Sequence, residues 1–537
     1  MVADRDRDDQ AVPSARSPGC AIALLVFAQR TFQIPAWRPS RSICKVAERK
    51  RQMPIKTGQQ YIESLRDGRT LYIDGKVVSD VTAYPPLQGV IATIAGLYDD
   101  QHDPALQKIL TYASPSSGEL ASATYLEAGT EPEFQHLAGC FHLRAKRTFG
   151  LMGRLTDFMS AFLVDTAVAL KALGKHDAAA RAQGLVELCR ENDVQVTHAL
   201  IDPQSDRSTL DAPSEAVRVI ERRGDGIVVS GCRLLSTLAP VANECYVGPY
   251  YPRRSGEEPF MLAFVVPMNA PGLSVICRES FYRGQDRFDR PLSSRFDEGD
   301  AILMFDRVLV PHARMIVDGD IEAYNGMLQA RPGYTPLQAT IRSTIKLRFL
   351  AGLATAIARA NGRDKLPRFQ AAIGELVALI SVAEGIRAGA IAEGLGRAQA
   401  FARGEVRIEG DGLTGPQTVG VCGGAAINFF FPYANTKAAD VLRLAAGSGV
   451  LAMSAADYAN PDIGPLMDKW LVGPGIDAKR RLQLMKLAWD MTGTEFGSRA
   501  GLYERLYSGD PEINAQRWFR SGITRECEAL VDQLLNN

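Results

Sequence analysis

Hydrophobic residues recur at three- and four-residue spacing through most of the chain from residue 53 to about residue 195. This spacing gives each segment one apolar face and predicts amphipathic α-helices. Between the first two helices, apolar and polar residues alternate on both sides of Asp74-Gly75, a pair typical of hairpin turns, and this predicts two short strands. The helical segments are 57–68, 87–100, 151–174 and 179–193.

The pattern changes from about residue 196 to residue 322. Short apolar, β-branched runs are separated here by Gly, Pro and Asn, which predicts the strands of a compact β-barrel or sandwich. No alternation of strands with helices is visible, and this argues against a doubly wound nucleotide-binding sheet. The runs are 226–240, 244–251, 260–268, 273–281 and 301–311.

Long helical patterns return after residue 322. Each of four segments has a wide apolar stripe, and four such helices predict a bundle. We therefore expect an α+β fold with a helical domain at 53–195, a β-barrel domain at 196–322 and a helical bundle at 323–537. The four segments are 337–362, 369–395, 435–449 and 476–496.

Residues 1–52 have a different composition. They begin with a charged, featureless stretch, and their one apolar run, 20–28, is too short to span a bilayer. An acidic, distant start and the lack of a small-residue cleavage site argue against a signal peptide. We interpret 1–52 as an extension, either disordered or the product of a mis-assigned start, with the folded protein beginning at Met53; a genuine tail is the alternative.

The composition limits the class of function. The chain has 537 residues, 46% of them hydrophobic and 23% charged, with 61 basic and 61 acidic side chains and no net charge. Nothing in this balance favours binding to a nucleic-acid backbone, and a small-molecule pocket is expected instead. The nine cysteines include no C-x-x-C pair, which argues against a zinc ribbon or a locally ligated iron–sulfur cluster and fits a reducing cytoplasm.

One short motif is similar to a dinucleotide-binding fingerprint. Residues 447–452, GSGVLA, satisfy G-x-G-x-x-G/A, but the segment before them is helical, whereas the fingerprint follows a strand. We interpret the motif as a helix end. Without a nicotinamide site, reducing equivalents must come from elsewhere.

Two segments carry candidate chemistry. In 147–162, Arg154, Asp157 and Phe158 lie on nearby turns, so a cation and an aromatic ring face one pocket, unless the segment is an ordinary amphipathic helix. In 197–208, THALIDPQSDRS, His198 precedes a loop whose amides, Gln204 and Arg207 suit a flavin ring or its phosphates, although a lone histidine is more often structural.

Read together, the segments resemble the 4-hydroxyphenylacetate 3-monooxygenase family, the oxygenase component of two-component flavin monooxygenases. The resemblance covers nearly everything after Met53, from YIESLRDGRTLYIDG to GLYERLYSGDP. It includes RTFGLMGRLTDF, THALIDPQSDRS, STLAP, PGLSVICRESF, FDRPLSSRFDE, DAILMFDRVLVP and LMKLAWDMTGTEFGSR. It implies an acyl-CoA dehydrogenase-like fold, with an N-terminal helical domain, a middle β-barrel and a C-terminal four-helix bundle, usually as a homotetramer.

The resemblance also implies a reaction. Family members accept reduced FAD from a separate NAD(P)H:flavin reductase. Oxygen adds to the flavin to give a C4a-hydroperoxide, which transfers its distal oxygen ortho to the hydroxyl of a phenol. The expected protein is therefore a cytoplasmic, FADH2-dependent aromatic monooxygenase of aromatic catabolism, with O2 as co-substrate and no metal, nucleic-acid or membrane partner.

The resemblance assigns roles to individual residues. His198 would hydrogen-bond the phenol oxygen and the reactive region of the flavin, and Arg154 would stabilise the phenolate. The implied substrate-binding residues are Arg154, Phe158, His198, Pro249 and Tyr250. The implied cofactor-binding residues are His198, Gln204, Ser205, Asp206, Arg207, Thr237, Gly497, Ser498 and Arg499.

Two positions depart from the family's known subgroups. Phe158 stands where hydroxyphenylacetate hydroxylases have a tyrosine, so a hydroxyl donor worth about 1–3 kcal/mol in a buried site is missing. Arg290 stands where halophenol-type relatives have a histidine. Three substrate classes therefore remain open: a 4-hydroxyphenylacetate-like phenolic acid, a halophenol and a tyrosine-derived biosynthetic intermediate. The choice of FADH2 or FMNH2 as the reduced flavin is open as well.

The more distant alternatives are of two kinds, other enzymes and a relative without turnover. A 4-hydroxybutyryl-CoA dehydratase-like enzyme needs cluster cysteines close together in the first domain, whereas Cys140 and Cys189 are far apart, and an acyl-CoA dehydrogenase needs a carboxylate base. A flavin-binding relative without turnover is the other alternative, and Phe158 is the feature that supports it.

Overall fold

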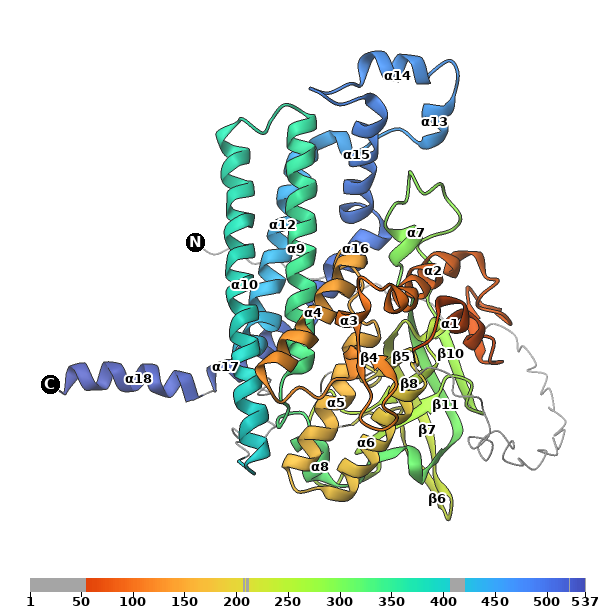
Figure 1. Cartoon of the computed structure of the whole chain (residues 1–537), viewed down its shortest axis with the longest axis vertical. Helices are drawn as coiled ribbons and strands as arrows, with labels where there is room; N and C mark the ends of the chain where they lie inside the picture. Colours follow the sequence, from red (N-terminus) through yellow and green to blue (C-terminus); the bar gives the residue numbers. More distant parts are fainter. Residues whose placement is uncertain (1–54, 206–207, 209–211, 406–420, 521, 537) are drawn as a thin grey trace, which may run out of the picture. The chain divides into compact units, whose positions relative to one another are not determined.

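The strands of the middle of the chain form two sheets beside the helices (Figure 1). In the computed structural model, the six-stranded sheet has the order β2-β1-β10-β11-β7-β6 and the four-stranded sheet the order β12-β9-β8-β5, while β3 and β4 form a separate pair. The strands are β1 Thr70–Ile73, β2 Lys76–Val77, β3 Thr111–Ala113, β4 Leu120–Ser122, β5 Val196–Ala199, β6 Arg218–Arg223, β7 Gly226–Thr237, β8 Glu244–Val247, β9 Leu262–Pro267, β10 Leu273–Cys277, β11 Asp300–Pro311 and β12 Met315–Asp318.

The structure describes residues 55–205, 208, 212–405, 421–520 and 522–536. The expectations for 1–52, for Asp206 and for Arg207 lie outside these residues. The fold of the described residues belongs to one unit, Met53–Asn537.

The predicted hairpin at Asp74-Gly75 is confirmed. Ile73 pairs with Lys76 across the turn, and Asp74 and Gly75 have φ angles of 53° and 70°, which a two-residue turn of this type requires. The hairpin also joins a more distant element, because β1 runs parallel to β10, with Leu71 opposite Val275. The six-stranded sheet therefore takes two strands from the segment in which mainly helices were expected.

Two of the first helices pack against the four-stranded sheet, α5 on β5 and α6 on β12, and α4 and α5 pack against α9 of the bundle. Helix α5 is buried along nearly its whole length, since it packs against both α6 and α9. It begins at Thr156, later than the pattern predicts, because the loop before it is held by Arg342 and Glu298. The helices are α1 Gly58–Ser64, α2 Pro85–Asp99, α3 Gln107–Leu110, α4 Glu131–Arg147, α5 Thr156–Ala172, α6 His176–Glu191, α7 Ser293–Phe296 and α8 Ile321–Gly326.

The four long helices expected after residue 322 are present and pack around α9 (Figure 1). They are α9 Tyr334–Ala360, α10 Pro367–Ala402, α12 Phe431–Ala446 and α15 Ala478–Thr492. The motif at 447–452 is the predicted helix end, since α12 stops before Gly447, whose φ is 57°. The remaining helices are α11 Val421–Ala425, α13 Ala455–Ala459, α14 Gly464–Trp470, α16 Glu495–Arg505, α17 Pro511–Phe519 and α18 Gly522–Leu535.

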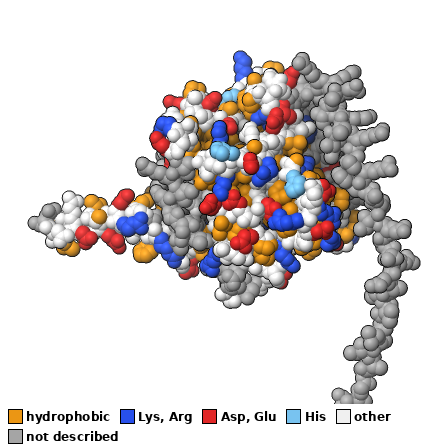
Figure 2. Space-filling view, turned by 90° about the horizontal axis from the view of Figure 1, so that it is seen from below, with side chains coloured by type: hydrophobic (Ala, Val, Ile, Leu, Met, Phe, Trp, Pro, Cys, Tyr) orange, Lys and Arg blue, Asp and Glu red, His pale blue; other side chains and the backbone are white. Residues whose placement is uncertain are grey.

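The surface matches the neutral composition. On the face drawn in Figure 2, cationic and anionic side chains are interspersed with apolar ones. Such mixing gives no broad field of one sign on this face.

A buried ionic network connects α9 to α16. Arg342 Nη2 lies 3.0 Å from Glu504 Oε2, and Lys346 Nζ lies 2.9 Å from Glu504 Oε1. All three side chains are at most 3% exposed. Arg342 also donates to the carbonyl oxygen of Gly150 at 3.0 Å, so the network holds the loop that precedes α5.

Glu504→Gln tests this network. The change keeps the side-chain shape but leaves Arg342 and Lys346 buried without a carboxylate, so we expect the free energy of unfolding to fall by about 3–5 kcal/mol. Urea unfolding followed by circular dichroism measures this loss. Glu512→Gln on α17 is the control, because Glu512 is exposed and should change stability by less than about 0.5 kcal/mol. Equal stability of Glu504→Gln and the unmodified chain would contradict the role of the network.

Candidate active site

Three of the residues expected at the site come together beside the start of α5. Phe158 lies in the first turn of α5, and His198 lies on β5, which pairs in parallel with β8. The rings of Phe158 and His198 have centroids 6.2 Å apart, and the Arg154 guanidinium lies 4.1 Å from the centroid of the Phe158 ring. Arg154 belongs to the loop before α5 rather than to the helix itself.

The C-terminal segment completes an aromatic enclosure around Arg154. The guanidinium lies 4.2 Å from the ring centroid of Tyr507 and 5.4 Å from that of Tyr503, so rings of α5 and of the α16 region stack on the same cation. Such cation–π contacts are strengthened where water is excluded. The two tyrosines were not predicted as site residues, although they lie in GLYERLYSGDP, four residues apart and near the end of the family resemblance.

Several buried polar atoms around this enclosure have no hydrogen-bond partner within the described part of the chain. They are Arg154 Nη1, Nδ1 and Nε2 of His198, and the hydroxyl oxygens of Tyr503 and Tyr507. Buried polar groups are nearly always satisfied in folded proteins, so a group of unsatisfied ones marks a place built for a polar ligand.

The charges of the two central residues differ. Burial, with the nearby Arg154 cation, lowers the pKa of His198 to about 3, and Asp300 opposes this only weakly. The imidazole is therefore neutral near pH 7, a form in which one ring nitrogen carries a proton to donate and the other a lone pair to accept one. Burial disfavours the charged form of Arg154, but Tyr503 and Tyr507 outweigh it and raise the pKa of Arg154.

Two carboxylates, those of Glu298 and Asp300, hydrogen-bond to the backbone and to the arginines around this site. Glu298 Oε1 accepts the backbone N–H of Gly153 at 2.8 Å and that of Arg154 at 3.1 Å, while Glu298 Oε2 accepts from Arg499 at 2.6 Å. Asp300 accepts from Arg499 Nη2 at 2.7 Å and from Arg278 Nε at 3.0 Å. Although burial opposes it, these two arginines hold the pKa of Asp300 well below its usual range.

Two of the residues expected at the cofactor, Thr237 and Arg499, lie beside the site. The hydroxyl of Thr237 donates to Asp300 Oδ1 at 2.9 Å, and Arg499 pairs with Asp300 and Glu298, so both adjoin the site through carboxylates. Gly497 is required by packing, because a Cβ there would lie 2.5 Å from the backbone carbon of Met491.

Other expected residues lie farther out. Ser498, Gln204 and Ser205 are exposed, and Ser205 donates to Glu215 at 3.2 Å. Arg290, in the loop before α7, donates to the carbonyl oxygen of Asp289 at 3.2 Å.

Pro249 and Tyr250 lie in the loop after β8. Pro249 is buried, and Tyr250 packs edge-to-face on Tyr251 with ring centroids 4.7 Å apart. A Cβ on Gly509 would lie 2.9 Å from the Tyr250 hydroxyl oxygen, so this loop touches the segment that follows Tyr507. Burial raises the pKa of Tyr250.

Among the described residues, no group of three or more His, Cys, Asp or Glu side chains is placed so that it could hold a metal ion. Cys140 and Cys189 are buried free thiols, and burial raises the pKa of Cys140 to about 12.

His198 should make stability depend on pH. Its folded pKa of about 3 lies below the ordinary value of 6.5, so the unfolded chain takes up a proton first as the pH falls. Its contribution is fully present above pH 6.5 and is lost as the pH falls toward 3. Between pH 7 and pH 5, we expect the unmodified chain to lose about 2 kcal/mol more than His198→Asn in urea unfolding.

The control for this comparison is His176→Asn, at the exposed start of α6, which should keep the pH dependence of the unmodified chain. If His198→Asn also keeps that dependence, His198 is not held neutral by its surroundings.

Comparison with known proteins gives a consistent picture. The family model described as 4-hydroxyphenylacetate 3-hydroxylase N terminal matches residues 57–317, and the C-terminal model of the same family matches residues 332–536. The 4-hydroxyphenylacetate 3-monooxygenase oxygenase component of Geobacillus sp. (strain PA-9) is 32% identical over 480 residues, covering 87% of this chain and 94% of the relative. The pyoverdin chromophore biosynthetic protein PvcC of Pseudomonas aeruginosa is 32% identical over 501 residues, covering 90% of this chain and 95% of that relative.

A solved structure agrees with the fold. The oxygenase component HpaB of 4-hydroxyphenylacetate 3-monooxygenase, complexed with FAD and 4-hydroxyphenylacetate, superposes with a TM-score of 0.79 at 29% identity, covering 90% of this chain and 99% of the other. The expected fold class is thus confirmed. The chain belongs to the 4-hydroxyphenylacetate 3-hydroxylase family of flavin-dependent monooxygenase oxygenase components.

Proposed function

We propose that this protein hydroxylates a phenol ortho to its hydroxyl group, using reduced FAD and O2. The observation that carries the proposal is the buried set of unsatisfied polar atoms on Arg154, His198, Tyr503 and Tyr507, enclosed by aromatic rings. A phenol fits this set, because its ring matches the aromatic walls and its hydroxyl needs a polar partner.

Each residue has a distinct part in the proposed reaction. Arg154 keeps its charge and favours the phenolate form of a phenol beside it, which makes the ortho carbon more electron-rich. His198 is neutral, so it accepts a hydrogen bond from the phenol hydroxyl or donates one to the phenolate oxygen without adding a second cation. Phe158 and Tyr507 keep water away from these groups.

FAD supplies the electrons and the activated oxygen when it is bound. His198, Thr237 and Arg499 are the described residues that we propose to hold it, together with Gln204 and Ser205. A basic and hydroxyl-bearing set of this kind suits the polar edge of a flavin and its phosphates. The Arg499 side chain is already oriented by Glu298 and Asp300, which accept from all three of its nitrogens.

We propose that a separate NAD(P)H:flavin reductase provides the reduced FAD. The fingerprint-like segment 447–452 ends a helix and has no strand before it. We also propose a cytoplasmic location and a role in aromatic catabolism. The thiols of Cys140, Cys189, Cys232, Cys245, Cys277 and Cys527 are free, as a reducing compartment favours.

A phenol panel tests the activity. The full chain, a flavin reductase, NADH and FAD are incubated with 4-hydroxyphenylacetate, tyrosine and chlorophenols in turn, and mass spectrometry identifies products that have gained one oxygen atom. We expect a catechol from at least one phenol. Consumption of NADH with hydrogen peroxide as the sole product for every phenol would contradict the proposal.

Phe158→Tyr tests how the site selects its phenol. The new hydroxyl would lie in the enclosure beside Arg154, and a buried hydrogen bond of about 1–3 kcal/mol corresponds to roughly a 5- to 150-fold rise in kcat/KM for 4-hydroxyphenylacetate. Phe162→Tyr, one turn along α5, is the matched control and should give no such rise. An unchanged or lower kcat/KM for Phe158→Tyr would show that the missing hydroxyl does not limit this substrate.

We propose a homotetramer, in which α10 packs against a second copy. In the described part of the chain, α10 is the one helix long and apolar enough to cross a membrane by length and composition, with a mean hydropathy of 1.5 and 17% of that window buried. Its exposed positions include small residues at helical spacing, among them Ala371, Gly374, Ala378, Gly385 and Ala388. Small side chains let two helices approach closely.

The C-terminal helix supports the same proposal. None of the residues of α18 is buried, and Leu530, Leu534 and Leu535 are 68%, 77% and 76% exposed. An amphipathic helix with an uncovered apolar face needs a partner surface.

Ala378→Arg tests the α10 contact. A charged, long side chain at the centre of a close helix pair should dissociate the assembly, and light scattering after size exclusion measures the molar mass. Gln370→Arg, at the start of α10, adds the same charge and should leave the mass unchanged. An unmodified chain that runs as a monomer, or Ala378→Arg with an unaltered mass, would contradict the proposal.

A further inference from the structure

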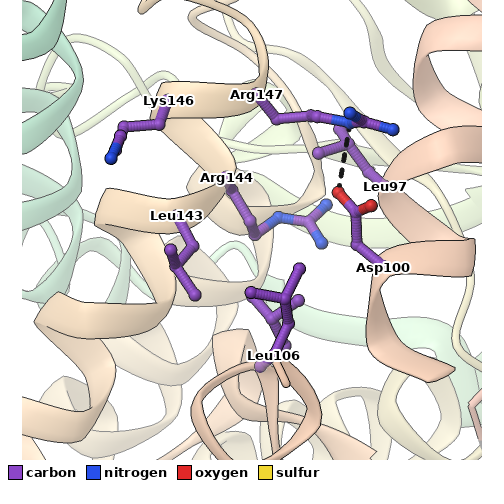
Figure 3. Close-up of a pocket in the computed structure, with 8 residues that line it drawn as sticks. Leu97, Asp100, Leu106, Leu143, Arg144, Lys146 and Arg147 are labelled. Atoms are coloured by element: carbon purple, nitrogen blue, oxygen red, sulfur yellow. Dashed lines mark ion pairs between the residues drawn. The ribbon is translucent and has the colours of Figure 1, made fainter. Parts of the chain in front are cut away.

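A cavity of about 260 Å³ lies between α2, α3 and α4, and it shares no residue with the site around His198 (Figure 3). Its apolar wall is made of leucines from the three helices and from the segment before α3. Its polar part comes from the end of α2 and the last turn of α4. The lining residues are Leu97, Asp100, Leu106, Leu110, Leu143, Arg144, Lys146 and Arg147.

Arg144 is the unusual member of this lining. It is 6% exposed, and its Nε is buried without a hydrogen-bond partner. Among the described residues, its guanidinium makes no hydrogen bond and no ion pair within 4.0 Å. Figure 3 shows the guanidinium in the middle of the cavity, between Leu106 and Asp100, while Lys146 extends away from it.

The acidic side chains near Arg144 hydrogen-bond or form ion pairs with other residues. Asp100 pairs with Arg147 at 3.3 Å, as the dashed line in Figure 3 marks. Asp157 accepts the backbone N–H of Phe158 at 2.9 Å and the Gln338 amide at 3.2 Å. Asp193 likewise accepts from the backbone of Lys56 and from Gln101. None of these carboxylates pairs directly with Arg144.

A buried cation without a partner is costly, and an anion that binds it recovers part of that cost. The lining carries three cationic side chains and one carboxylate, so the cavity favours an anion. A planar carboxylate matches the guanidinium fork with two parallel hydrogen bonds. The leucine wall favours an apolar body on the same molecule.

We propose that this cavity binds a small carboxylate with a short apolar body, whose carboxylate group lies on Arg144 and whose apolar part contacts Leu97, Leu106, Leu110 and Leu143. The volume is below the range of roughly 300–1,000 Å³ typical of drug-sized ligands, so the ligand is about the size of benzoate. A free phosphate is disfavoured, because its strongly hydrated oxygens would face the leucines.

Benzoate is the probe. Isothermal titration calorimetry on the full chain, without flavin, should show benzoate binding that weakens at least tenfold in Arg144→Met. Lys108→Met, on α3 but outside the lining, removes the same charge and should change the Kd by less than twofold. The neutral analogue benzamide should not bind. Benzoate held near Arg154 is unaffected by the Arg144 change, so the difference between the titrations reports this cavity alone.

Several results of these titrations would contradict the proposal. Equal benzoate affinity of Arg144→Met and the unmodified chain, no benzoate binding at all, or equal binding of benzamide would each overturn the proposal. Inorganic phosphate binding that depends on Arg144 while benzoate does not bind would overturn the carboxylate assignment. If Arg144→Met does not fold, Leu106→Trp decides, since it fills the cavity and should abolish benzoate binding. Because no flavin or turnover is involved, failure here leaves the proposed function untouched.

Discussion

The carboxylate of Glu298 is the point on which the site depends. It is 2% exposed and receives the backbone N–H groups of Gly153 and Arg154 and the guanidinium of Arg499. Through these bonds Glu298, which precedes β11, connects the loop before α5 with helix α16. These three segments are far apart in the sequence. Charge-assisted bonds to a buried carboxylate are strong and directional, so they set the position of Arg154 before any ligand arrives.

Because the position of Arg154 is fixed, a charged guanidinium and the neutral imidazole of His198 lie in the same buried site. Arg154 is a guanidinium cation on which aromatic rings stack, whereas His198 is neutral because it is buried beside that cation. A cation next to a neutral imidazole suits a phenol that must be bound, oriented and partly deprotonated. Since both side chains have unsatisfied nitrogens, the folded chain already bears the cost of assembling the site.

Sequence patterns predicted the long elements well and the contacts between them poorly. The helices α9, α10, α12 and α15 followed from apolar periodicity, and the turn at Asp74-Gly75 from its residue types. The four residues of β5 are all buried and show no alternation, so the strand that carries His198 was not recognised. The pairing of β1 with β10 and the stacking of Tyr507 on Arg154 join distant segments, which no local pattern reports. The family resemblance, rather than periodicity, singled out Arg154 and His198.

The central claim is that Arg154 and His198 direct oxygen to the phenol. Single turnover tests it most directly: reduced FAD is mixed anaerobically with the chain and the preferred phenol, O2 is added, and hydroxylated product and hydrogen peroxide are counted per flavin oxidised. The account predicts mainly hydroxylated phenol from the unmodified chain and mainly hydrogen peroxide from His198→Ala and Arg154→Met, with the flavin oxidised in every case. If both variants hydroxylate the phenol as efficiently as the unmodified chain, the account of the site is wrong.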